Sequence, residues 1–329
     1  MSALNPEIRK LLKKQKYQLA GKATAVKKCL WNHNALRENR FCYKHYYGID
    51  SHRCIQAAVN PALCQHDCLF CWRVQARDIR VDPDYFRFIQ ARDDAEISSF
   101  FDSPEIIADK LVDLYRRIVC GYKPFVFPEK YNEAMDPVHV TLSLAGEPLL
   151  YPWMAELVDL LKKQGKTVFI VTNGTVPERV KEMKEKNSLP TQLYMTLPAP
   201  DEKTYVKTCR PLVKGTWNKI METLEAFNQL DSRTVTRLTV AKEINMVDPK
   251  GYSELINRAN SSFVEVKGVV VVGGAMKRIE RSTMPSHPEI MAFAHKLEEF
   301  TDYKIIAEQP ESKVAILSNS KHPLSFKNH

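Results

Sequence analysis

Three cysteines in one short segment have the spacing that most directly predicts chemistry. Cys64, Cys68 and Cys71 form the pattern C-x3-C-x-aromatic-C in Cys64-Gln-His-Asp-Cys68-Leu-Phe-Cys71. Three thiolates in so short a loop can hold three irons of a [4Fe–4S] cubane, which leaves the fourth iron open to a small molecule. Zinc sites more often show paired C-x2-C knuckles and four protein ligands. The spacing therefore predicts an iron–sulfur cluster, with a zinc site or buried thiols as the alternatives.

A second set of cysteines precedes the first, in a basic and polar segment. Cys29, Cys42 and Cys54 are spaced widely, and free cysteines are often simply buried. Their closeness to the first motif makes a second cubane with an open iron reasonable. Lys44 stands two residues after Cys42 among aromatic residues. Near a cluster such a lysine could have a depressed pKa and form a Schiff base with a carbonyl; an ordinary basic residue is the alternative.

Two polar motifs follow apolar segments later in the chain. Ala145-Gly146-Glu147-Pro148 comes after the segment 138–144, and Val171-Thr172-Asn173-Gly174-Thr175 closes the segment 167–173. The Cys64 loop itself comes after the apolar segment 54–59. Catalytic residues of barrel folds sit at the carboxyl ends of the strands, so these motifs are expected at one mouth. Phe70 offers an apolar face there on which an adenine could pack.

The elements that must position these motifs alternate along the chain. The expected strands are 54–59, 138–144, 167–173, 192–197, 236–244 and 263–272. The expected helices are 5–20, 103–120, 153–164, 178–185, 216–230, 252–260 and 288–300, with Ser103 as an N-cap. Such alternation predicts a parallel sheet with right-handed crossovers. Six βα units favour a partial (β/α)6 barrel of the TIM type, with a doubly wound sheet as the alternative.

The chain is expected to have three parts. Residues 1–53 form a basic N-terminal extension that carries the second cysteine set, and residues 54–302 form the barrel. Residues 303–329 hold a short C-terminal β extension, with two strands around a turn at Pro310-Glu311, and a tail. No run of apolar residues is long enough to cross a membrane, and the N-terminus lacks the apolar core of a secretory signal, so a cytoplasmic location is expected.

Positive charge is concentrated in the first part. Residues 1–53 hold 12 lysines and arginines against three acidic residues, whereas the remaining chain holds 36 of each. A neutral body with a basic head indicates that a polyanion meets one end of the molecule. A solvated basic helix without a partner is the alternative.

The first cysteine motif resembles the signature of the radical S-adenosylmethionine (SAM) superfamily, and the two polar motifs agree with it. The resemblance implies that SAM chelates the open iron and that its one-electron cleavage yields a 5′-deoxyadenosyl radical. It places the methionyl amine at the family's G-G-E-P motif, whose first glycine is Ala145 here. The cofactor-binding residues implied are Phe70, Gly146, Glu147, Asn173 and Thr175.

Over residues 20–318 the chain resembles the tRNA 4-demethylwyosine synthases, in their stand-alone archaeal-type form. The resemblance includes Thr208-Cys-Arg-Pro211, Phe263-Val-Glu-Val-Lys-Gly268 and Met284-Pro-Ser-His287. It assigns Cys29, Cys42 and Cys54 to a second [4Fe–4S] cluster. It also implies that Lys44 holds pyruvate as an imine, unless the open iron of the second cluster chelates the pyruvate. Electrons would come from a separate ferredoxin- or flavodoxin-type protein, and a monomer is expected.

The reaction implied is a carbon–carbon lyase reaction in wyosine and wybutosine biosynthesis. N1-methylguanosine at position 37, in the anticodon loop of phenylalanine tRNA, would combine with two carbons of pyruvate. The radical would abstract hydrogen from the N1-methyl group, and the resulting methylene radical would add to pyruvate. Loss of the carboxyl carbon and ring closure on the guanine amine would give 4-demethylwyosine.

Contacts to RNA are expected from the basic head, since phosphates attract lysine and arginine. The candidates are Lys13, Lys14, Lys16, Lys27 and Lys28, with Arg73, Lys267, Arg278 and Arg281 as weaker ones. Two other functions remain open at this point. Another radical SAM enzyme, such as a glycyl-radical activase, would need neither a basic head nor the second cysteine set. A non-catalytic iron–sulfur or zinc RNA-binding module would need no SAM site.

Overall fold

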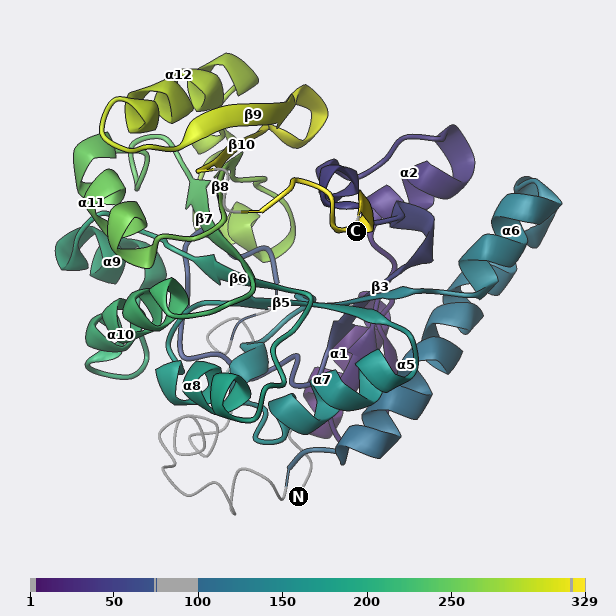
Figure 1. The fold of residues 1–329 in the computed structure, drawn as a ribbon. Helices are drawn as coiled ribbons and strands as arrows, with labels where there is room; N and C mark the ends of the chain where they lie inside the picture. The colour runs from purple at the N-terminus through teal and green to yellow at the C-terminus, as the bar shows by residue number, and fades with distance from the viewer. Residues whose placement is uncertain (1–3, 74, 76–99, 320–321, 329) are drawn as a thin grey trace.

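A ten-stranded mixed sheet organises the computed structural model, which describes residues 4–73, 75, 100–319 and 322–328 (Figure 1). The strands are β1 (Gln18–Ala20), β2 (Thr24–Val26), β3 (Cys54–Ala58), β4 (His139–Leu142), β5 (Thr167–Thr172), β6 (Gln192–Thr196), β7 (Arg233–Val240), β8 (Phe263–Gly268), β9 (Lys304–Gln309) and β10 (Val314–Ser318). Their order is β1-β2-β3-β4-β5-β6-β7-β8-β10-β9. Strands β3 to β8 are parallel, and each pairs with the next. These six strands confirm the partial (β/α)6 barrel; among the described residues, hydrogen bonds do not close the sheet.

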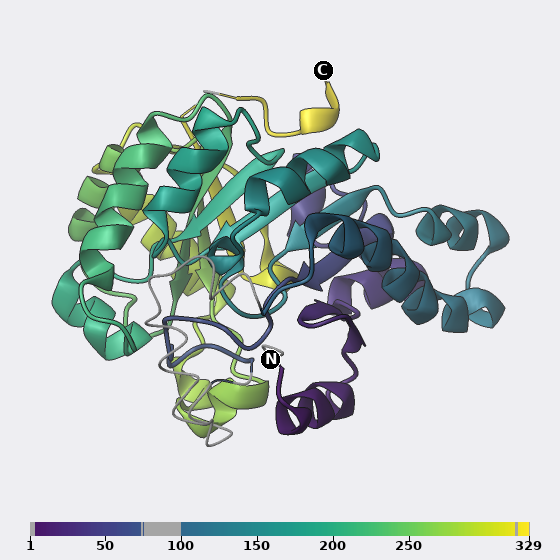
Figure 2. The same cartoon turned by 90° about the horizontal axis from the view of Figure 1, so that it is seen from below.

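Helices cover the outer face of the curved sheet (Figures 1 and 2). The helices of the described residues are α1 (Pro6–Lys14), α2 (Leu30–Glu38), α5 (Pro104–Val119), α6 (Pro128–Met135), α7 (Met154–Lys163), α8 (Pro177–Glu185), α9 (Glu202–Cys209), α10 (Thr216–Asn228), α11 (Pro249–Ala259) and α12 (His287–Glu298). The largest apolar cluster packs helices α5, α7, α8, α10, α11 and α12 against the strands. Full burial of a leucine or valine side chain contributes about 1.5–3 kcal/mol, so this layer dominates the stability of the fold. None of the helices in the described ranges has the length and apolar character needed to cross a bilayer.

Local sequence explains where several helices begin. Asn5 caps α1, because its side chain accepts a hydrogen bond of 2.8 Å from the backbone N–H of Ile8. Ser286 and Glu289 form a reciprocal capping box at the start of α12. Ser103 occupies the expected N-cap position of α5, but its side chain makes no capping hydrogen bond. Pro104 in the first turn favours the start of that helix, because its fixed φ suits a helix and it lacks only an N–H group that would have no partner there.

The N-terminal segment has more regular structure than the sequence predicts. The helix expected over 5–20 ends at Lys14, because Lys16 takes a positive φ of 66° and the chain turns into β1. Strands β1 and β2 form a hairpin, and β2 pairs antiparallel with β3. Helix α2 follows with Cys29 at its N-cap. Helices α6 and α9 are likewise missing from the expectation. The proposed division into three parts stays a prediction.

The C-terminal expectation is confirmed in its two strands. Strands β9 and β10 pair antiparallel around a turn at Pro310–Ser312, and β10 pairs antiparallel with β8. This hairpin extends the sheet beyond the parallel strands and lies beside α12 in Figure 1. Val314 and Ile316 of β10 also pack in one buried cluster with Tyr43 and Tyr47, so the hairpin contributes to the interior of the barrel.

Candidate active site

The loop that carries Cys64, Cys68 and Cys71 follows β3 at the carboxyl end of the parallel strands. Its backbone is hydrogen-bonded to the end of α9: Asp67 N–H donates to Cys209 O at 3.0 Å, and Leu69 N–H donates to Thr208 O at 2.9 Å. Arg210 adds an ion pair of 2.9 Å to the Asp67 carboxylate. The Thr208-Cys-Arg segment therefore fixes the shape of the cysteine loop.

The three thiols lie close enough for their charges to interact. Burial and the neighbouring Cys68 thiolate raise the pKa of Cys71 to about 11, and the same two causes hold the pKa of Cys64 well above its usual range. The pKa of Cys68 is also well above its usual range, first because its thiol is hydrogen-bonded with Cys209 and then because of burial. Three such thiolates are stable together only when cations neutralise them, and irons of a cubane would do so. The donor set fits a [4Fe–4S] cluster.

One trio of metal-type donors also occurs within the part of the chain that the structure describes. His66, Cys68 and Cys209 each place one donor atom within 4.8 Å of the others, a spacing suited to a single ion. His66 Nε2, however, lies 2.6 Å from the hydroxyl of Tyr205, and burial lowers the pKa of His66 to about 3. Cys209 is 1% exposed and packs with Tyr205 and Ile220. These contacts favour a packing role for both residues.

The motif after β4 forms a cradle beside this loop. Gly146 has a φ of +73°, and a Cβ atom there would lie 2.0 Å from the carbonyl oxygen of Asn60, so only glycine is tolerated. The buried carboxylate of Glu147 accepts hydrogen bonds from the Thr172 hydroxyl at 2.5 Å and the Asn173 N–H at 2.7 Å. Desolvation nevertheless raises the pKa of Glu147 to about 7. An amine N–H placed here would find a carboxylate acceptor fixed in position.

The motif after β5 connects this cradle to the cysteine loop. The Asn173 side-chain amide lies 3.6 Å from Cys64 Sγ, and its Oδ1 accepts a hydrogen bond of 2.6 Å from the Thr175 hydroxyl. Thr175 also contacts Gln65 of the cysteine loop. Phe70 packs against residues after β7 and β8. The structure thus brings all of the expected SAM-binding residues to the same end of the sheet.

The second cysteine set is assembled from three separate elements. Cys29 is the N-cap of α2, Cys42 precedes the 3-10 helix Tyr43–Tyr47, and Cys54 begins β3. Burial and then the charge of Cys29 raise the pKa of Cys42 to about 12, and Cys29 also acts on Cys54, whose pKa burial raises to about 11. The charge of Cys29 thus acts on both Cys42 and Cys54, so the three thiols lie in one region of the fold and are candidates for a second donor set.

Lys44 lies beside this set, inside the barrel. Its ammonium is 4.4 Å from the ring centroid of Tyr194 on β6. Burial, followed by the charge of Arg237, lowers the pKa of Lys44. Lys267 on β8 lies in the same part of the barrel interior, called the chamber below, where its ammonium donates to Ser312 O at 2.8 Å and burial lowers its pKa to about 8. Lys267, a weaker RNA candidate from the sequence, is an interior residue.

The chamber contains a buried charge network that sequence reasoning missed. Arg237 Nε lies 2.7 Å from a Glu265 carboxylate oxygen, and Glu265 also accepts hydrogen bonds from the Tyr43 and Tyr47 hydroxyls at 3.0 and 2.9 Å. Glu265 is completely buried. Loss of one partner of such a pair costs about 3–5 kcal/mol, so this network fixes the segment that carries Lys44. The available signal was the charged Glu265 and Lys267 in an otherwise apolar strand.

The residues expected to contact RNA fall into an exposed group and a group that is partly or fully buried. Lys13, Lys14 and Lys16 are exposed around the end of α1. Lys27 is half-buried, with its ammonium 4.8 Å from the ring centroid of Tyr17. Arg73 is buried and is described below. Arg278 donates to the backbone oxygens of Leu69 and Cys71.

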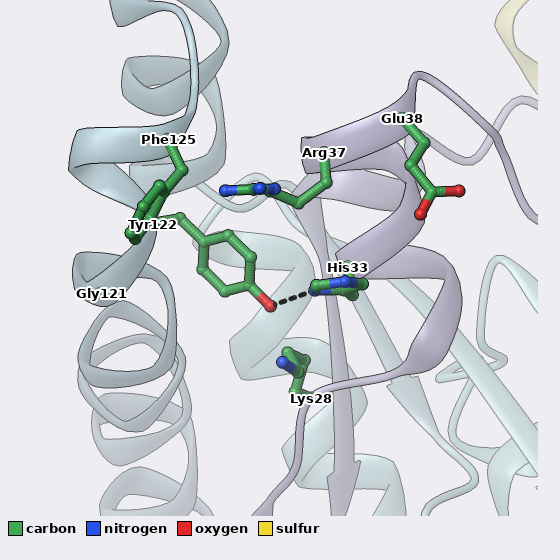
Figure 3. A pocket seen from close by; sticks show the side chains of 7 residues that line it. All are labelled: Lys28, His33, Arg37, Glu38, Gly121, Tyr122 and Phe125. Carbon is green, nitrogen blue, oxygen red and sulfur yellow. Dashed lines mark hydrogen bonds between the residues drawn. The ribbon is translucent and has the colours of Figure 1, made fainter.

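Lys28 lines an open hollow of about 530 Å³ between α2 and the segment that follows α5 (Figure 3). The Lys28 ammonium is 5.1 Å from the ring centroid of Tyr122, and the Arg37 guanidinium is 4.8 Å from that of Phe125. His33 Nδ1 lies 2.7 Å from the Tyr122 hydroxyl. Tyr122 is buried, whereas the Phe125 ring is exposed, and cations beside an exposed aromatic ring are typical of surfaces that bind single-stranded nucleic acid.

Two family models match the chain. The model of the radical SAM superfamily matches residues 128–256, and the model of wyosine base formation matches residues 258–319. Among curated relatives, the SAM-dependent tRNA 4-demethylwyosine synthase of Pyrococcus abyssi is 41% identical over 94% of this chain and 88% of its own length. The enzyme of the same name from Methanocaldococcus jannaschii is 36% identical over 98% of both chains. The longer mouse enzyme is 33% identical, and the match spans 42% of its length.

Solved structures agree with these relatives. The structure of TYW1 with a lysine–pyruvate adduct bound superimposes with a TM-score of 0.84 at 34% identity, and the match covers 98% of this chain and all of that one. The crystal structure of archaeal TYW1 gives a TM-score of 0.76 at 32% identity, covering 98% of this chain and 99% of that one.

Proposed function

This chain belongs to the family of SAM-dependent tRNA 4-demethylwyosine synthases, and from that membership we propose how its own residues perform the reaction. It is a radical SAM enzyme with a [4Fe–4S] cluster. The substrates would be N1-methylguanosine-37 of phenylalanine tRNA and pyruvate, and the product 4-demethylwyosine. The observation that carries this proposal is the position of Lys44, an enclosed amine beside a second set of three thiols inside the barrel.

Cys64, Cys68 and Cys71 would hold the cluster to which SAM binds. When bound, the reduced cluster and SAM supply the radical that removes hydrogen from the N1-methyl group. Glu147 would accept a hydrogen bond from the methionyl amine, while Asn173 and Thr175 would orient the rest of the cofactor. Gly146 leaves the space that this approach requires.

Lys44 would form an imine with the ketone of pyruvate, with release of water. The neutral amine is the nucleophile, and both burial and the Arg237 charge favour that form by lowering the pKa of Lys44. A relative solved with a lysine–pyruvate adduct supports this role. Cys29, Cys42 and Cys54 would hold a second cluster next to the adduct. Pyruvate bound only to that cluster remains the alternative, and it predicts no covalent adduct.

The test is an anaerobic single-turnover assay with reconstituted enzyme, dithionite, SAM, pyruvate and tRNA that carries N1-methylguanosine-37. Nucleoside mass spectrometry should detect the tricyclic product, and its formation should require pyruvate. Release of 5′-deoxyadenosine without any change in the tRNA would show a radical SAM enzyme with another substrate and contradict the proposal. No cleavage of SAM at all would support a non-catalytic RNA-binding module.

The Glu147 carboxyl predicts a pH dependence of SAM binding. Burial raises its pKa to about 7, so the group is neutral below that pH and gains its negative charge above it. The charged form is the better acceptor for the N–H groups of the methionyl amine, and the affinity for SAM should therefore rise with pH up to about 7 and then level off. Below pH 7 the change approaches ten-fold per pH unit. Equilibrium dialysis with the holoenzyme measures this, and Glu147→Gln should bind weakly with a flat pH profile.

The hollow lined by Lys28 and Arg37 predicts a contribution to tRNA binding. Each cation would neutralise one phosphate, while the exposed ring of Phe125 offers a surface for base stacking. Lys28→Ala and Arg37→Ala should each weaken binding several-fold and reduce the slope of log affinity against log salt by about one. Lys296→Ala on α12 is the matched control, since Lys296 is exposed at the other end of the sheet. An unchanged salt slope in both variants would rule out these contacts.

The separate ferredoxin- or flavodoxin-type electron donor, the monomeric state and the cytoplasmic location stay predictions. Contacts from Lys13, Lys14 and Lys16 to tRNA are retained as a proposal, because all three are exposed on the basic head.

A further inference from the structure

Arg73 is a buried arginine with unused hydrogen-bonding capacity. Its side chain is 7% exposed, and Nη1 donates to the Tyr17 hydroxyl at 3.2 Å. The guanidinium carbon lies 3.3 Å from the ring centroid of Trp72, so the aromatic ring fixes the plane of the charged group. Nη2 is buried and has no hydrogen-bond partner within the described chain. A buried donor without a partner costs free energy, which indicates that a ligand supplies the acceptor.

The position of Arg73 limits what that ligand is. The thiolates of Cys71 and Cys29, one from each cysteine set, are both close enough for their charges to act on the guanidinium. Arg73 therefore lies near both proposed clusters. A methyl group that reacts with a radical generated at one cluster and with a keto acid on a lysine beside the other must lie near both as well. The base that carries the methyl group would then lie beside Arg73.

The chemistry of the target base identifies the edge that remains for recognition. This step rests on the proposed function. N1 carries the reacting methyl group and the exocyclic amine closes the new ring, so the Watson–Crick edge of the guanine must be left open. The other edge presents O6 and N7, which are both acceptors. An arginine fork donates two hydrogen bonds to this pair, the commonest specific contact to guanine.

We propose that Arg73 recognises the target guanine by donating hydrogen bonds from Nη2 and a second guanidinium N–H to its O6 and N7 atoms. Trp72 and Tyr17 orient the guanidinium for this contact. Lys27, whose ammonium lies 4.8 Å from the Tyr17 ring centroid and 6.0 Å from that of Trp72, adds positive charge beside the same edge. The contact selects guanosine at the position to be modified and leaves the reacting atoms accessible.

The test compares three anticodon stem–loop RNAs that differ only at position 37. They carry N1-methylguanosine, its 7-deaza analogue, which lacks the N7 acceptor, or N1-methylinosine, which keeps O6 and N7 but lacks the amine. Affinities are measured by fluorescence anisotropy with reconstituted wild type, Arg73→Lys and the exposed control Arg117→Lys. The wild type and the control should bind the 7-deaza RNA about 10-fold or more weakly than the other two. Arg73→Lys keeps the charge but loses the fork, so it should bind all three RNAs alike.

Several results would overturn this inference. One is equal wild-type affinity for the 7-deaza and N1-methylguanosine RNAs, and another is discrimination that survives in Arg73→Lys. A uniform loss of affinity with a smaller salt slope would show a phosphate contact instead. Weaker binding of SAM by Arg73→Lys without RNA would show a cofactor contact. Iron content and circular dichroism check that the variant folds, and failure of the proposed function would be seen separately, as absence of tricyclic product from wild type.

Discussion

Lys44→Ala should abolish formation of the tricyclic nucleoside while cleavage of SAM continues. The alanine variant cannot form the imine, so the keto acid is no longer held beside the methyl group. Burial and the Arg237 charge lower the pKa of Lys44, which raises the fraction of the wild-type amine that is neutral and nucleophilic. Lys44→Arg should be equally inactive, because a guanidinium retains its charge and cannot attack a ketone.

The measurement combines borohydride reduction with peptide mass spectrometry. Reduction in the presence of pyruvate should attach the keto acid to the peptide that contains Lys44, and the label should be lost in Lys44→Ala. Lys203→Ala, at an exposed lysine of α9, serves as the control that keeps both label and product. Label on Lys267, whose pKa of about 8 makes it the second amine of the chamber, would contradict the assignment. Product formed by Lys44→Ala without any adduct would instead favour pyruvate bound to the second cluster.

The architecture and the first site could be read from the sequence because their signals are local. Each parallel strand is a short apolar segment, and each motif stands directly after its strand. Because each motif stands at the carboxyl end of its strand, Cys64, Glu147 and Asn173 can be predicted to lie close together without knowledge of any other contact. The hydrogen bond between Asn173 and Cys64 Sγ shows the result.

The interior network could not be predicted, because it depends on the register between strands. Arg237 and Glu265 are directly opposite each other on β7 and β8. The sequence placed the first of these strands at 236–244, whereas the structure has it at Arg233–Val240. A register error of a few residues moves every side chain to a different neighbour. Tyr43 and Tyr47 reach Glu265 from more than 200 residues away in the sequence, a separation at which local patterns carry no information.

The hairpin and helix of the N-terminal segment were missed for a different reason. Strands β1 and β2 have three residues each, which is too short for an alternating pattern to be recognised. Helix α2 buries asparagines at positions 32 and 34 together with Ala35 and Leu36, so polar residues interrupt its apolar face. Asn32 donates to the Tyr115 hydroxyl and to Ser51 O. Tertiary hydrogen bonds thus replace the apolar contacts that a sequence pattern would reveal.

Cys42→Ala should separate the two cysteine sets, because it removes one of three protein ligands from only one of them. Reconstituted wild type should hold about eight irons per chain, four for each cubane, and the variant about four. The variant should still cleave SAM, since Cys64, Cys68 and Cys71 lie on a different loop with its own hydrogen bonds to α9. It should form no tricyclic product, because the second set lies beside Lys44. Iron analysis, Mössbauer spectroscopy and assay of 5′-deoxyadenosine measure these quantities.

Two controls make the iron count decisive. Cys120→Ala removes an exposed thiol and should leave about eight irons and full activity. Cys71→Ala should reverse the pattern, with the second cluster retained and SAM cleavage lost. About four irons in the wild type, or an unchanged count in Cys42→Ala, would show that the second set holds no cluster. Lys44 would then have to position the keto acid with the help of Arg237 and Glu265 alone, and the three thiols around Cys42 would be packing residues, with the raised pKa values of Cys42 and Cys54 keeping those two protonated.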